Sequence, residues 1–327
     1  MTSKESALYH SILVPLDGSP FGEHALPMAL SLARRAGAQI HLAHVHASPR
    51  LGSAPAADQA RWDGERIYFE RLEQRLRASG DVPVTTMLLS GPVVQALREY
   101  AMVAETDLIV MTTHGRGTLS SAWIGSIPDT LMRCVSQPVL LVRPEGPRPD
   151  LLRAPVVKHV LVPLDGSALA EQILAYATEL CRLMQAECTL LQAIEPLFTA
   201  YWPELPAIVA DEQAQEQLRA QGQAYLDHVA AQLRARGLRV RTATVVEQAA
   251  TAVLDYARDH EVDLIALETH GYSGLVRWIV GGVADKVIRG AGVPVLLHRP
   301  PGGSEWTHEE MSGWRHAARR YSAEHKD

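Results

Sequence analysis

Short, nearly unbroken apolar runs alternate with amphipathic stretches in the first part of the chain. The runs SILVPL, QIHLAHV, VTTMLL, DLIVM and PVLLV begin at residues 11, 39, 84, 107 and 138. Continuous aliphatic runs of this length are typical of strands that are buried on both faces of a parallel sheet. Apolar residues recur at helical spacing over 23–37 and 92–105. The alternation predicts an α/β fold, a doubly wound five-stranded parallel sheet with helices on both faces.

The same pattern of apolar runs and motifs occurs a second time in the chain. HSILVPLDGSPFGEHAL at 10–26 returns as KHVLVPLDGSALAEQIL at 158–174, and TDLIVMTTHG at 106–115 returns as VDLIALETHG at 262–271. Because the order of the blocks is kept, the chain is a tandem duplication of one domain, with an insertion near 197–213 in the second copy. We expect domain one over 1–146, a Pro- and Arg-rich linker over 147–156, domain two over 157–300 and a helical C-terminal tail over 301–327.

The composition argues against several classes of protein. The 327 residues carry a formal net charge of −6, which argues against non-specific binding to nucleic acid. No apolar stretch approaches the ~18–20 residues of a membrane helix. The three cysteines, Cys134, Cys181 and Cys188, form no CxxC pair, consistent with a reducing compartment. We therefore predict a cytoplasmic protein that binds neither nucleic acid nor a membrane.

The loop after the first strand, PLDGS, is the first candidate for ligand contact. In doubly wound sheets ligands bind beyond the carboxyl ends of the strands, where the strand order reverses. Asp17 in this loop either accepts a hydrogen bond from a ribose hydroxyl or contacts Mg²⁺, or it only forms the turn and caps the helix. The residues alone leave both interpretations open.

The loop after the fourth strand, within 111–129, is the second candidate. It matches neither a Walker-type loop nor G-x-G-x-x-G, but Gly115 is followed by nine residues and then by Gly125 and Ser126 at a helix start. A glycine lets the backbone approach an anion, and a helix start supplies N–H donors. The Ser126 hydroxyl either adds a charge-assisted bond of about 1.5–3 kcal/mol or caps the helix. The loop is thus either a phosphate cradle or a flexible connection.

These motifs resemble the universal stress protein family, whose nucleotide-binding members carry G-x-x-G, nine residues, then G-S or G-T after the fourth strand. LVPLDGS, HV in the second strand and PVLLV match the family too, in both copies and over nearly the whole chain outside the linker and tail. The resemblance implies that domain one binds an adenine nucleotide (ATP, or else ADP or AMP), with Mg²⁺ if ATP is bound, with Asp17 near ribose or metal and Val45 near adenine. The implied contacts are Pro15, Asp17, Val45, Met111, Thr112, Gly115, Gly125, Ser126 and Ile127.

Both copies depart from the family pattern. Thr112 stands where the first motif glycine is expected, and its branched side chain hinders close approach of a phosphate. In domain two that position is Glu268, the hydroxyl position is Gly282, and Ala193 replaces Val45. A carboxylate ~5 Å from a phosphate would cost roughly 3 kcal/mol at an effective dielectric near 20. We expect domain two to hold a weaker site, formed by Asp165, Ala193, Glu268, Gly271, Gly281 and Gly282.

Histidines in HLAHVH raise the question of a metal. His44 and His46 share one face of the second strand and His41 faces the other way, and no acid or cysteine lies at a useful local spacing. We predict no metal site apart from an Mg²⁺ contact at Asp17.

The leading functional hypothesis is a stress-response or signalling protein in which nucleotide in domain one biases conformation or partner binding. The alternative is a nucleotide-independent interaction scaffold, and a very slow ATPase comes third. No catalytic residue is assigned, because hydrolysis needs more than one aspartate. The resemblance also implies that the strands PVLLVRP and PVLLHRP pair across a pseudo-twofold axis. The chain would then be an intramolecular pseudo-dimer with an unidentified protein partner; further homodimerisation stays open.

Overall fold

The computed structural model describes residues 8–46, 55–78, 80, 82–114, 124–152, 154–196, 212–269 and 282–299. The predicted site residues Gly115, Gly271 and Gly281 and the predicted tail over 301–327 lie outside these ranges. In the described part of the chain, no helix is both long and apolar enough to cross a membrane.

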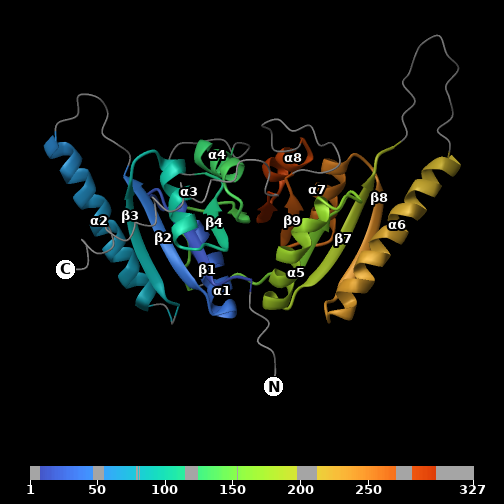
Figure 1. The fold of residues 1–327 in the computed structure, drawn as a ribbon, viewed down its shortest axis with the longest axis horizontal. Coiled ribbons are helices and arrows are strands. Elements are labelled where there is room, and N and C mark those ends of the chain that lie inside the picture. Colours follow the sequence, from blue (N-terminus) through green and yellow to red (C-terminus); the bar gives the residue numbers. More distant parts are fainter. Residues whose placement is uncertain are drawn as a thin grey trace, which may run out of the picture.

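Strands and helices alternate in the first copy of the repeat, called unit one below (Figure 1). The helix over Leu26–Ala36 (α1) is capped by Gly37, whose φ of 67° is the left-handed conformation that glycine adopts without strain. The strands are β1 (Ser11–Pro15), β2 (Gln39–His46), β3 (Val84–Ser90), β4 (Leu108–Thr112) and β5 (Val139–Val142). The helices are the 3₁₀ turn η1 (Gly22–Ala25), α1 (Leu26–Ala36), α2 (Pro55–Ala78), α3 (Val93–Val103) and α4 (Ser126–Cys134).

The second copy, called unit two, repeats this order. Its strands are β6 (His159–Pro163), β7 (Glu187–Ile194), β8 (Val240–Val246), β9 (Leu264–Glu268) and β10 (Val295–His298). Its helices are the 3₁₀ turn η2 (Ala170–Gln172), α5 (Ile173–Met184), α6 (Glu212–Ala235), α7 (Ala249–Asp259) and α8 (Gly282–Gly290). The connection between β7 and α6 is longer than that between β2 and α2, which places the extra residues of unit two where the insertion was predicted.

All ten strands form one sheet in the order β3-β2-β1-β4-β5-β10-β9-β6-β7-β8. Within each unit the neighbouring strands are parallel, as the apolar runs predicted. The two units meet where β5 pairs with β10 in the antiparallel sense, with Leu140 opposite Leu296. The predicted α/β fold is confirmed, and so is the pairing of the two fifth strands.

Helices cover both faces of this sheet. One core cluster joins α1, α2, α5 and α6 to the sheet through residues such as Leu30, Phe69 and Leu180, and the other joins α3, α4, α7 and α8 through residues such as Leu97 and Val287. Figure 1 shows α1 beside α5 and α4 beside α8 near the centre, with α2 and α6 at the outer ends. Because each cluster contains residues of both units, the units share their cores.

Polar contacts also cross between the units. Tyr9 Oη donates to the carbonyl of Tyr176 at 3.0 Å, and Arg143 Nη2 donates to the carbonyl of Arg289 at 2.9 Å. In unit one β1 lies between β2 and β4, so the chain leaves β1 and β4 toward opposite sides of the sheet. The crevice between those two connections is the switch point at which α/β sheets bind ligands.

Candidate functional site

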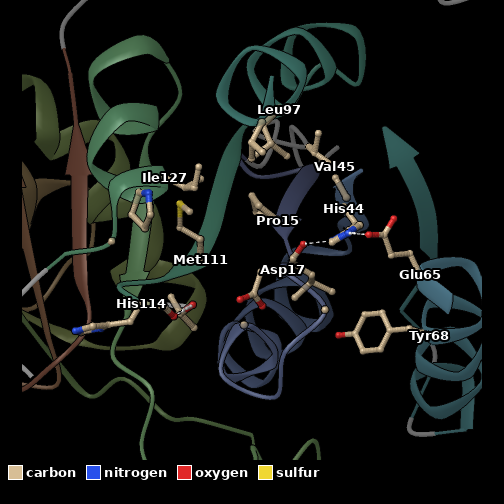
Figure 2. Close-up of a pocket in the computed structure, with 18 of the residues that line it drawn as sticks. Pro15, Asp17, His44, Val45, Glu65, Tyr68, Leu97, Met111, His114 and Ile127 are labelled. Atoms are coloured by element: carbon tan, nitrogen blue, oxygen red, sulfur yellow. Dashed lines mark hydrogen bonds and ion pairs between the residues drawn. The ribbon is translucent and has the colours of Figure 1, made fainter. Parts of the chain in front are cut away.

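A cavity of about 1000 Å³ opens at the carboxyl ends of β1, β2 and β4 (Figure 2). It brings together all eight described residues that the sequence assigned to the unit-one site, from four different elements. The lining comprises Pro15, Leu16, Asp17, Gly18, Gly22, Ala43, His44, Val45, Arg61, Gly64, Glu65, Tyr68, Val93, Leu97, Met111, Thr112, His114, Gly125, Ser126, Ile127 and Pro128, called the unit-one cavity below.

Asp17 has a structural role and also lies in the cavity. Its Oδ1 accepts hydrogen bonds from the Ser19 backbone N–H at 2.9 Å and from Ser19 Oγ at 2.6 Å. A Cβ atom at Gly22 would lie 2.7 Å from the same oxygen, so glycine leaves room for the carboxylate. Asp165 makes the same two bonds to Ser167 in unit two. Turn formation is therefore common to both units, and it leaves the Asp17 side chain on the cavity wall.

One wall of the unit-one cavity is apolar. Val45, Leu97 and Met111 are buried in the core cluster on the α3 and α4 side, and Val93 and Ile127 pack against that cluster. Figure 2 shows Val45, Leu97, Met111 and Ile127 around one side of the opening. A surface of this kind suits a flat heterocycle, because burying apolar area contributes about 25 cal/mol per Å².

The start of α4 forms the end of the cavity farthest from α2. Gly125 is the N-cap residue, with φ −61° and ψ 154°, and as a glycine it has no side chain that could cap the helix. Ser126 is thus the first helical residue rather than the cap, which does not match the capping interpretation of its hydroxyl. The N–H groups of Ser126 and Ile127 fall in the first turn, where no helical carbonyl accepts them. These donors and the helix dipole favour an anion.

Thr112 and Thr113 hold the end of β4. Thr112 Oγ1 donates to the carbonyl of His114 at 2.8 Å, and Thr113 Oγ1 lies 2.6 Å from His114 Nδ1. Gly125 N–H donates to the carbonyl of Thr113 at 2.8 Å. The Thr112 hydroxyl therefore bonds to its own loop, and the Gly125–Thr113 bond joins the start of α4 to the end of β4 on one side of the cavity.

A polar wall on the opposite side was missed by the sequence analysis. It consists of His44 at the end of β2 together with Arg61, Glu65 and Tyr68 of α2. Glu65 Oε2 lies 2.6 Å from His46 Nδ1, and its Oε1 lies 3.3 Å from His44 Nε2. The signal was the pair His44 and His46 on one strand face, but their acidic partner Glu65 comes from α2, the next element, and its sequence does not show how that helix packs on β2.

Tyr68 is fixed by a second set of polar contacts. Its hydroxyl donates to Glu23 Oε1 at 3.1 Å, and Arg75 Nη1 donates to Glu23 Oε2 at 3.0 Å. Burial, followed by the Glu23 carboxylate, raises the pKa of the Tyr68 phenol. His41, on the other face of β2 as predicted, lies 2.9 Å from Tyr100 Oη. Among the described residues, no three His, Cys, Asp or Glu side chains are grouped so as to hold a metal ion.

In unit two, the Glu268 carboxylate is paired with a histidine of the neighbouring strand. Its Oε2 lies 2.9 Å from His298 Nδ1, and both side chains are almost fully buried, at 2% and 6% exposure. The His298 ring packs on Tyr176 of α5 with centroids 4.6 Å apart. Burial raises the pKa of the Glu268 carboxyl, and His298 partly offsets this rise. Ala193 lies in β7, and Gly282 is the first residue of α8.

Comparisons with known proteins bear on the whole chain. The sequence model of the universal stress protein family matches residues 8–143 and 157–299. A universal stress protein of Mycolicibacterium smegmatis is 24% identical over 306 residues, covering 90% of this chain and 99% of that protein. One from Methanocaldococcus jannaschii is 29% identical over 144 residues, covering 44% of this chain and 83% of that protein. A crystal structure of a universal stress protein from Archaeoglobus fulgidus has the same fold, with a TM-score of 0.64 at 18% identity, covering 90% of this chain and 98% of that one. Since the family model matches both units, the chain belongs to the universal stress protein family.

Proposed function

We propose that unit one binds an adenine nucleotide, foremost ATP with Mg²⁺, and that unit two binds one weakly or not at all. The supporting observation is that the predicted site residues lie together in space. Residues from β1, β2, β4 and α4 that the sequence pattern assigned to the site line a single cavity. Binding there would bias the conformation or the partners of a stress-response or signalling protein.

The chemistry of the unit-one cavity fits the parts of a nucleotide. The apolar wall around Val45 and Met111 suits the base. The first turn of α4, at Ser126 and Ile127, suits the phosphates, because its N–H groups point outward at the positive end of the helix dipole. Asp17 lies between these two ends (Figure 2), where its carboxylate would meet a ribose hydroxyl or the Mg²⁺ that accompanies ATP. The metal would supply positive charge between the phosphates and this carboxylate.

We assign no catalytic residue. Phosphoryl transfer to water needs a positioned water and charge stabilisation at the transferred group in addition to an aspartate. Any hydrolysis of ATP by this protein is therefore expected to be slow, with the bound nucleotide acting as a ligand.

The test is calorimetric titration of the full chain with ATP and Mg²⁺, beside release of nucleotide from heat-denatured protein. We expect about one adenine nucleotide per chain. Gly125→Val should abolish binding, because its branched side chain would stand over the start of α4. The backbone angles of Gly125 suit valine, and a Cβ there meets ordinary contacts at 3.5 Å. Gly282→Val at the start of α8, where a Cβ meets nothing within 4 Å, is the control and should leave binding unchanged.

Other outcomes would contradict the proposal. If no nucleotide is released and millimolar ATP gives no heat, the nucleotide-independent scaffold is the better account. If two nucleotides bind per chain, the assignment of weak binding to unit two is wrong. If Gly282→Val lowers the affinity as much as Gly125→Val, the ligand is not in the unit-one cavity.

A further inference from the structure

Helix α2 places a carboxylate on the cavity wall, and two histidines of β2 hold it there. His46 Nδ1 lies 2.6 Å from Glu65 Oε2, and His44 Nε2 lies 3.3 Å from Oε1. The other ring nitrogen of His44, Nδ1, donates to the carbonyl of Leu16 at 2.7 Å, which fixes that ring to the β1 loop. Figure 2 shows Glu65 reaching His44 at the edge of the opening.

The far nitrogen of His46 is also enclosed. Its Nε2 lies 3.1 Å from Asp58 Oδ1 and 3.0 Å from Arg61 Nη2, and Arg61 also bonds Asp58 at 2.8 Å. Both imidazoles are buried, and the Glu65 side chain keeps 20% of its surface exposed. The carboxylate is thus oriented from two sides and still reaches the cavity, since Glu65 is among its lining residues.

Unit two shows that the fold does not need this cluster. The repeat puts Gln192 and Ile194 where unit one has His44 and His46, and Gly222 where it has Glu65. A Cβ at Gly222 would lie 2.7 Å from Gln192 Oε1, so the glutamine occupies that space. By contrast, the hydrogen bond between the long helix and the 3₁₀ turn is present in both units. Tyr225 Oη donates to Glu171 at 2.9 Å, as Tyr68 Oη does to Glu23.

Glu65 lies at the end of the cavity opposite the proposed phosphate site. The sheet order runs β2-β1-β4, so the ends of β2 and β4 are two strand spacings apart, roughly 10 Å. The start of α4 lies on the β4 side, and Glu65 lies on the β2 side (Figure 2). A nucleotide with its phosphates at α4 and its base on the apolar wall therefore directs the far edge of the base toward Glu65.

We propose that Glu65 determines base specificity by accepting a hydrogen bond from the exocyclic amino group of adenine, with His44 and His46 as positioning residues. The inference rests on the proposed function of unit one. An ionised carboxylate only accepts hydrogen bonds. It therefore favours a purine with an amino group at that edge and repels one with a carbonyl oxygen there. A buried polar group without its partner is where binding sites discriminate most strongly.

The first experiment uses the wild-type protein and needs no variant. ATP, ITP and N6,N6-dimethyl-ATP are titrated with Mg²⁺ by calorimetry. We expect ITP, which has a carbonyl at the amino position, and the dimethyl compound, which lacks the donor hydrogens, to bind at least about tenfold more weakly than ATP. Equal or tighter binding of ITP or of the dimethyl compound would overturn the proposal while leaving nucleotide binding itself intact. Failure of all of them to bind would overturn both proposals.

The second experiment asks whether Glu65 is the cause. Glu65→Gln keeps the shape of the side chain and gains a donor, so the ratio of ATP to ITP affinity should fall toward one. Glu70→Gln, on the exposed side of the same helix where Glu70 pairs with Arg66, is the matched control and should keep the wild-type ratio. An unchanged ratio in Glu65→Gln would contradict the assignment. If that variant does not fold, equal binding of ATP and ITP by the wild-type protein still overturns the proposal.

Discussion

Replacing His298 by valine, the residue at the equivalent position Val142 of unit one, should destabilise the protein strongly. The substitution removes the partner of Glu268, whose side chain is 2% exposed. Leaving a buried carboxylate without its partner typically costs about 3–5 kcal/mol, because the carboxylate keeps its desolvation penalty. Copying both unit-one residues, in the double variant Glu268→Thr with His298→Val, removes both buried polar partners together and should leave the free energy of unfolding near or above the wild-type value.

The assay is thermal unfolding of the wild type, both single variants and the double variant. For a chain of 327 residues, a loss of this size corresponds to a lowering of Tm by roughly 4–7 °C for His298→Val. Glu268→Thr alone leaves the buried imidazole without its hydrogen-bond partner and should cost about 1–3 kcal/mol. The order of Tm values should therefore place the double variant above both single ones.

The pH dependence of His298→Val gives a second readout. Burial raises the pKa of the Glu268 carboxyl in the folded protein, so the folded state binds a proton more readily than the unfolded chain. The free energy of unfolding then rises as pH falls from the folded-state pKa toward the ordinary one. His298→Val should regain stability on mild acidification more than the double variant does. If the double variant is instead as unstable as the sum of the single ones, the pair is not coupled and the reasoning is refuted.

Three further outcomes follow from local contacts. Burial lowers the pKa of His41, so the unfolded chain binds a proton at this histidine more readily than the folded protein does. The folded protein therefore loses stability as pH falls below the ordinary histidine pKa. The Tm of His41→Leu should fall less than that of the wild type between about pH 7 and pH 5. Tyr68→Phe removes the hydrogen bond to Glu23 and should lower the free energy of unfolding by about 0.5–1.5 kcal/mol in denaturant titrations; no change would mean that water replaces the hydroxyl. Gly290→Ala should cost about 1–3 kcal/mol by the same measurement, because a Cβ there would lie 2.6 Å from Leu254 Cδ1; a neutral result would show that this leucine repacks.

The sheet and the loops at its carboxyl edge could be predicted from the sequence because their signals are local. A buried strand is a continuous aliphatic run, and a loop after such a run must lie at the carboxyl edge of the sheet. Pro15 and Asp17 follow from that logic, as do Gly125 and Ser126, whereas Val45 was implied only by the family resemblance and Leu97 of the apolar wall was not predicted. The second copy of the repeat carries the same runs and loops in the same order, which supports the same prediction independently.

The polar wall could not be predicted, because its contacts depend on how α2 lies over β2. Asp58, Arg61 and Glu65 fall on one helix face by their spacing, but only the packing shows that this face meets His44 and His46. Glu268 presents the same difficulty. The sequence marks it as a departure from a glycine position, whereas its partner His298 is brought to it by the register between β9 and β10.

The antiparallel junction of β5 and β10 also determines from which side of the sheet a ligand or partner reaches the carboxyl edge of each unit. Since every strand of unit one runs opposite to its counterparts in unit two across that junction, the carboxyl edges of the two halves open on opposite rims of the common sheet. A protein that docks over one rim therefore contacts the carboxyl edge of a single unit, and its binding depends on the conformation of that unit. Communication between the rims would have to run through the central strands and the cores that both halves share.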